Sequence, residues 1–184
     1  ILGYAQIFSS DKSLTSQQQQ GIKVIQQSGN YLFTLINDVL DLSKIEVGRV
    51  ELYPTDFNFT AFLQHLRDLF QLRAQQKGLT FIFKTVSVLP LGLHGDEKRL
   101  RQILINLLGN AIKFTQQGGV IFQVGYENGR LRLQVSDTGI GIAQTDLTKI
   151  FVPFQQVGDP NYRPEGTGLG LSITKNLVEL MGGE

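Results

Sequence analysis

Hydrophobic residues recur at alternating spacings of three and four along residues 16–47. The repeat includes Gly29 and the following apolar positions: Ile22, Ile25, Leu32, Ile36 and Val39. This spacing predicts one long helix whose apolar seam packs against another helix. Thr15 or Ser16 can cap the start of that helix, and Gly48 stands where a stop signal is expected.

A shorter apolar pattern occupies residues 1–10, ahead of the polar segment SSDKSLTS. The polar segment predicts a turn, so residues 1–48 are expected to form an antiparallel helical hairpin. The second helix has more apolar side positions than two helices can cover: Tyr31, Leu35 and Leu42. We therefore expect a homodimer in which two hairpins form a four-helix bundle. The alternative is a monomeric hairpin that packs on the rest of the chain.

After Gly48 the pattern changes to mixed helices and strands. In chain order it predicts a short strand, an amphipathic helix, a strand, a helix, a hairpin and a final helix: residues 50–59, 60–78, 79–86, 96–115, 118–139 and 171–183. Asn128 and Gly129 supply the two positive-φ residues of a tight hairpin turn. Helices and strands do not alternate regularly enough for a doubly wound sheet. We therefore predict an α+β chain, in which an α/β sandwich with helices on one face of a mixed sheet follows the hairpin.

Composition excludes several classes of protein. The 184 residues are 41% hydrophobic, which suits one ordinary core with a small extra module. The formal charge of +1 does not indicate a nucleic-acid groove, and we expect no nucleic-acid partner. The chain has no cysteine, which excludes disulfides, thiol nucleophiles and Cys-based zinc sites. No apolar run reaches the roughly 20 residues that span a bilayer, so no membrane contact is expected.

Three short stretches carry candidate chemistry, and the first lies on the helix predicted at 96–115. Asn106, Asn110 and Lys113 are four and three residues apart, so they share one helix face. An amide oxygen can ligate magnesium, and a lysine supplies the positive charge that a polyphosphate needs. The alternative is that these side chains only cover a solvated face.

The other two stretches are rich in glycine. Asp137 follows a predicted strand and precedes Gly139 and Gly141. Its carboxylate can accept a hydrogen bond from an exocyclic amino group of a base. The alternative is that Asp-x-Gly-x-Gly forms only a turn. In GTGLGLSI, glycines recur every second residue at a helix entrance, where exposed N–H groups bind anions. Leu171 stands where a dinucleotide fingerprint needs glycine, and neither a Walker loop nor the serine/threonine kinase signatures occur.

Together and in this order, these stretches resemble the ATP-binding domain of sensor histidine kinases, within the wider gyrase, heat-shock chaperone and histidine kinase group. NLLGNAIKFT matches the N box, DTGIGI the first glycine box, IFVPF the F box and GTGLGLSI the second glycine box. The preceding helices resemble the dimerisation and phosphotransfer hairpin of the same family. The resemblance implies two domains, a partial hairpin at 1–48 and an ATP-binding catalytic domain at 49–184.

The resemblance also implies roles for individual residues. Asn110 would ligate the magnesium ion that bridges the triphosphate, Lys113 would contact phosphate, and Asn106 would orient a water or nucleophile. Asp137 would read the adenine amino group. Arg163, in the lid segment QQVGDPNYRPE, would reach the γ-phosphate; a solvated loop charge is the alternative. The remaining implied ATP contacts line the ring, the ribose and the phosphates: Phe114, Gly139, Gly141, Ile142, Phe154, Gly166, Thr167, Gly168, Leu169, Gly170 and Leu171.

The chain departs from the family in two respects. The acceptor box His-Glu/Asp-x-Arg-Thr-Pro is missing, and neither His65 nor His94 is followed by such a box. A structural or merely exposed role is expected for both histidines. The strands that normally complete the sheet do not follow within the sequence. We expect a cytoplasmic piece of a longer kinase, with sensing domains upstream and a receiver domain as one option downstream.

The expected reaction is phosphoryl transfer from Mg-ATP to a histidine, and then to an aspartate on a response regulator receiver domain. This segment would bind ATP without phosphorylating itself. Two alternatives remain: a catalytically inactive dimeric scaffold that uses nucleotide only structurally, and an ATPase or serine kinase of the same superfamily. The helical hairpin argues against the second, because such enzymes need no phosphotransfer bundle.

Overall fold

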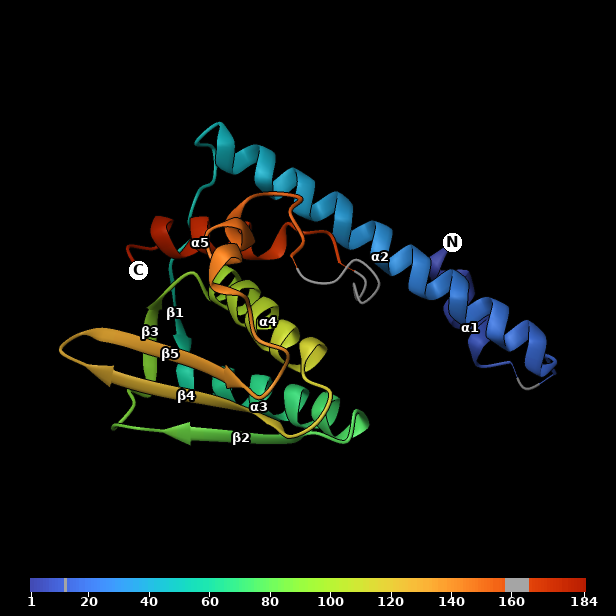
Figure 1. Cartoon of the computed structure of the whole chain (residues 1–184), viewed down its shortest axis with the longest axis horizontal. Coiled ribbons are helices and arrows are strands. Elements are labelled where there is room, and N and C mark those ends of the chain that lie inside the picture. Colours follow the sequence, from blue (N-terminus) through green and yellow to red (C-terminus); the bar gives the residue numbers. More distant parts are fainter. Residues whose placement is uncertain (12, 158–165) are drawn as a thin grey trace. The chain divides into compact units, whose positions relative to one another are not determined.

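The computed structural model describes residues 1–11, 13–157 and 166–184, so Arg163 lies outside the described residues. The described chain divides into two compact units, Ile1–Val50 and Glu51–Glu184 (Figure 1). No helix in these parts of the chain is both long and apolar enough to cross a bilayer.

The first unit is the predicted helical hairpin, α1 (Leu2–Ser9) and α2 (Ser16–Glu46). Thr15 caps α2 in a capping box: its Oγ1 accepts from the Gln18 N–H at 3.3 Å, and Gln18 Oε1 accepts from the Thr15 N–H at 2.8 Å. Leu2 of α1 packs on Gly29, where an added Cβ would lie 2.7 Å from Leu2 Cδ2. Gly29 is therefore the point of close approach between the two helices.

The second unit contains two small sheets and three α-helices in its described part. Its elements are β1 (Thr55–Asn58), α3 (Phe59–Gln76), β2 (Thr80–Thr85), β3 (Gly92–Gly95), α4 (Glu97–Phe114), β4 (Gly119–Glu127), β5 (Arg130–Asp137), the 3₁₀ turns η1 (Gln144–Asp146) and η2 (Lys149–Phe151), and α5 (Gly170–Leu180). β1 pairs with β3 in antiparallel fashion. In the larger sheet β4 lies between β2, which is parallel to it, and β5, which is antiparallel. The predicted mixed sheet is thus confirmed.

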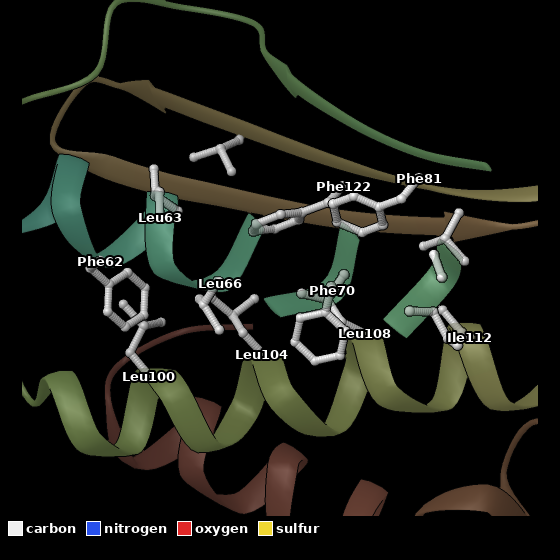
Figure 2. Close-up of a cluster of buried hydrophobic side chains, with 14 of the residues drawn as sticks. Phe62, Leu63, Leu66, Phe70, Phe81, Leu100, Leu104, Leu108, Ile112 and Phe122 are labelled. Atoms are coloured by element: carbon white, nitrogen blue, oxygen red, sulfur yellow. The ribbon is translucent and has the colours of Figure 1, made fainter. Parts of the chain in front are cut away.

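Helices α3 and α4 bury their apolar faces against each other and against one face of the larger sheet (Figure 2). The labelled side chains come from both helices and from β2 and β4: Phe62, Leu63, Leu66, Phe70, Phe81, Leu100, Leu104, Leu108, Ile112 and Phe122. Each fully buried side chain of this size contributes about 1.5–3 kcal/mol. This packing fixes the axis of α4, which carries the candidate site.

Capping and turn residues set the ends of these elements. The buried Asp96 caps α4, accepting from the N–H groups of Arg99 (3.0 Å) and Tyr53 (2.9 Å). Asn128 (φ 51°) and Gly129 (φ 78°) form the predicted turn between β4 and β5. The strand β3 was not predicted, because its four residues include two glycines and acquire strand geometry only by pairing with β1.

Candidate nucleotide-binding site

A chain of side-chain hydrogen bonds joins α4 to the first turns of α5. Asn106 Nδ2 donates to Thr174 Oγ1 at 2.8 Å, and Asn106 Oδ1 accepts from Asn110 Nδ2 at 3.3 Å. Thr174 is buried, and both asparagines are half-buried. These amides therefore belong to an organised contact between two helices, and they do not lie on a freely solvated face.

Asn110 has the chemistry of a magnesium ligand. Its hydrogen bond to Asn106 uses the amide nitrogen and leaves the harder donor, Oδ1, for a cation. Within the described ranges no three His, Cys, Asp or Glu side chains gather closely enough to hold a metal ion. A magnesium ion that keeps waters and phosphate oxygens needs only one or two protein ligands, so this residue set fits an ion that arrives with a polyphosphate.

The C-terminal end of α4 meets the first glycine segment. Asp137 ends β5 and accepts from the Gly139 N–H at 2.8 Å through Oδ1. A Cβ on Gly139 would lie 2.6 Å from the carbonyl oxygen of Phe114, so no larger residue fits there. The Ile140 N–H donates to that same carbonyl at 3.4 Å. Lys113 lies in the last turn of α4, with Nζ 4.9 Å from the centroid of the Phe114 ring.

The second glycine segment is joined to the F box. The Phe154 N–H donates to the Gly168 carbonyl at 3.0 Å, and both residues have positive φ, 63° and 71°. A Cβ on Gly168 would lie 2.9 Å from the Phe154 carbonyl carbon. Thr167 Oγ1 accepts from the N–H of the buried Leu169, and α5 begins at Gly170. The first turn of α5 presents backbone N–H groups and the positive end of the helix dipole.

The structure brings six of the predicted residues together in three close contacts. Asn106 meets Gly170, where a Cβ would overlap the amide of the asparagine. Phe114 meets Gly139, and Phe154 meets Gly168. Gly141 has a positive φ of 68°, and Ile142 is exposed beside it. Sequence reasoning missed Thr174, whose only signal is its position one helical turn after Gly170.

Two family models match this chain, one in each of its two compact units. Residues 1–48 match the family model of the His Kinase A (phospho-acceptor) domain. Residues 95–184 match the model of the histidine kinase-, DNA gyrase B- and HSP90-like ATPase. The aerobic respiration control sensor protein ArcB of Escherichia coli is 43% identical over the whole chain, which covers 24% of that protein.

Solved structures of histidine kinases are similar as well. Full-length ShkA in complex with AMPPNP gives a TM-score of 0.78 at 36% identity, over 99% of this chain and 38% of that one. The catalytic domain of ThkA gives 0.60 at 30% identity, over 70% of this chain and 82% of that one. ThkA in complex with the response regulator protein TrrA gives a TM-score of 0.67 at 26% identity. That match covers 99% of this chain and 50% of the ThkA chain.

The chain belongs to the histidine kinase family. Its carboxy-terminal unit has the fold of the ATPase domain that these kinases share with DNA gyrase B and HSP90. The predicted family and fold class are both confirmed. The chain spans about a quarter of the length of the curated relative ArcB.

Proposed function

We propose that this chain is the dimerisation and nucleotide-binding segment of a two-component sensor histidine kinase. It binds Mg-ATP in the second unit, and the whole protein transfers the γ-phosphoryl group to a histidine and then to an aspartate of a response regulator. The main support for the proposal is the contact of Asn106 with Gly170 and Thr174. This contact joins the face of α4 that bears Asn106 and Asn110 to the N-terminal end of α5, where backbone N–H groups can bind an anion.

Each part of the site has one task. Asp137 accepts from the exocyclic amino group of adenine, and Gly139 and Gly141 leave room for the ring. Lys113 and the first turn of α5 bind the phosphates. Asn110 holds the metal through Oδ1, while Asn106 is fixed by Thr174 and orients the attacking group. Bound magnesium would neutralise charge on the triphosphate oxygens.

The transfer requires an acceptor outside the two histidines of this chain. The bond from the γ-phosphorus to the bridging oxygen breaks, a bond to an imidazole nitrogen forms, and ADP leaves with the electron pair. His94 pairs with Asp56 at 2.7 Å across β1 and β3, and His65 lies exposed on α3. Neither stands in an acceptor box, so we propose that this chain supplies the nucleotide end of the reaction.

A dimer is proposed for the first unit. The hairpin exposes large apolar side chains that a monomer leaves in water: Ile1, Tyr4, Ile7, Phe8, Val24, Ile25, Tyr31, Leu32, Phe33, Ile36 and Leu40. Covering such a stripe with a second hairpin gives the four-helix bundle. A receiver domain is proposed as the second partner; the complex of ThkA with a response regulator supports it.

The proposal is tested with labelled Mg-ATP and two proteins, this chain and a version extended upstream of Ile1, each with an Asn110→Ala control. We expect acid-labile label only on the extended protein and its loss in Asn110→Ala. Label on this chain itself would contradict the proposal that His65 and His94 do not accept the phosphoryl group. Nucleotide binding without label on the extended protein would favour the inactive scaffold.

A further inference from the structure

The carbonyl groups at the C-terminal end of α4 have partners from three different segments. The last four carbonyls of any α-helix lack partners inside the helix. Here the Ala111 carbonyl accepts from the N–H and Oγ1 of Thr115, at 3.1 and 2.7 Å. The Phe114 carbonyl accepts from the Ile140 N–H in the first glycine segment. The two carbonyls between them, of Ile112 and Lys113, both accept from Lys77 Nζ at 2.7 Å.

Lys77 is held in place by the end of its own helix. It is the C-cap of α3: its N–H donates to the Ala74 carbonyl at 3.0 Å, and the Leu79 N–H donates to the same carbonyl at 2.9 Å. Gly78 makes this turn with a positive φ of 72°. The C-terminal ends of α3 and α4 lie on the same side of the unit (Figure 1), so the lysine side chain bridges them.

We propose that Lys77 is a positioning residue of the nucleotide site. Its ammonium group fixes the main chain at Ile112 and Lys113 with two charge-assisted hydrogen bonds at the negative end of the helix dipole. That main chain carries the Lys113 side chain, and the next carbonyl, of Phe114, contacts the segment that begins at Asp137. The inference rests on the proposed nucleotide-binding function of this site.

The first glycine segment is packed closely against the end of α4. An ideal Cβ at Gly139 would lie 2.6 Å from the Phe114 carbonyl oxygen and 2.7 Å from Asp137 Oδ1. The glycine main chain is therefore clamped between the end of α4 and the carboxylate proposed to read adenine. A shift of Phe114 moves both, and misplacement of binding groups by about 1 Å can cost a hundredfold in rate. Lys77 thus acts on the phosphate side through the main chain of Lys113, and on the adenine side through the adjoining carbonyl of Phe114.

The test compares Lys77→Met with Lys84→Met, an equal loss of charge at an exposed position of β2. Titration with magnesium and a non-hydrolysable ATP analogue is expected to show about tenfold weaker binding for Lys77→Met and no change for Lys84→Met. The amide NMR signals of Gly139 and Ile140 are expected to move only in Lys77→Met. Lys77→Arg, which can bridge two carbonyls, is expected to restore most of the affinity.

Two outcomes overturn the inference. One is a lower melting temperature of Lys77→Met with unchanged nucleotide affinity and unchanged Gly139 and Ile140 signals. Lys77 would then serve only as a cap for the helix ends. The other is an equal loss in Lys84→Met. If Lys77→Met does not fold, Lys77→Gln, which keeps one donor group, takes its place under the same criteria. Failure of the unsubstituted chain to bind would refute the proposed function, whereas the two amide signals would still report the coupling.

Discussion

Asn106 and Gly170 are in such close contact that a Cβ on the glycine would overlap the side-chain amide of the asparagine. The amide cannot easily turn away, because its Nδ2 donates to Thr174 and its Oδ1 accepts from Asn110. The two positions are 64 apart in the sequence, and their close approach is possible because glycine has no Cβ. The N box and the second glycine box are therefore one physical unit.

Gly170→Ala should damage this unit. The methyl group forces α5 away from α4 or breaks the bond from Asn106 to Thr174, so stability is expected to fall by about 1–3 kcal/mol. Affinity for Mg-ATP is expected to fall at least about tenfold. Gly109→Ala is the matched control for stability: its Cβ would meet open space within α4, and a gain of about 0.5–1 kcal/mol is expected. Native affinity in Gly170→Ala would contradict the arrangement.

Thr174→Val removes the partner of Asn106 and keeps the shape of the side chain. A half-buried amide donor without an acceptor is expected to cost about 1–3 kcal/mol in the free energy of unfolding, measured by urea denaturation. Nucleotide affinity is expected to fall as well, because Asn106 loses the shorter of its two side-chain hydrogen bonds. Thr174→Ser keeps the hydroxyl and should behave like the unsubstituted chain; equal losses in both variants would point to packing.

Asp137→Asn tests the adenine contact. The change removes the charged acceptor while the remaining amide oxygen can still accept from Gly139. Because a hydrogen bond to a charged group contributes about 1.5–3 kcal/mol, the affinity for ATP is expected to fall roughly 10- to 100-fold. Affinity for GTP should fall much less, so titrations with both nucleotides should show reduced discrimination. An unchanged preference for ATP would refute the assigned role.

The core makes a prediction that does not depend on ligand. Phe70 is fully buried on α3, whereas its neighbour Leu69 is 37% exposed. Phe70→Ala is expected to destabilise the second unit by about 3–5 kcal/mol, and Leu69→Ala by about 1 kcal/mol or less. Urea denaturation followed by circular dichroism provides the comparison. Similar losses of stability in both variants would show that the buried face of α3 is assigned incorrectly.

Features encoded locally were predictable from the sequence. Thr15 and Gln18 form a capping box three residues apart, and Asn128 with Gly129 makes a tight turn whose φ values few other residues tolerate. The motif residues were also within reach, because their spacing along α4 and at the start of α5 already places them on one face or at one helix end. Their roles in binding remain predictions.

Features that depend on distant partners were not predictable. Thr174 matters because of Asn106, and Lys77 because of two carbonyls at the far end of another helix. A buried threonine and a surface lysine are ordinary residues in any helix, so no spacing signals either role. The strand β3 was missed for the same reason, since only its pairing with β1 distinguishes it from a loop.

The position of β4 in the middle of its sheet has a consequence for folding. Its partner β5 follows through a two-residue turn, so that pair closes quickly. Its other partner, β2, precedes it by the whole of β3 and α4, and a parallel pairing across such a crossover must await the helix. On the ribosome, β2 leaves the exit tunnel with both edges unpaired and stays a target for chaperones or for misassembly until β4 has been synthesised.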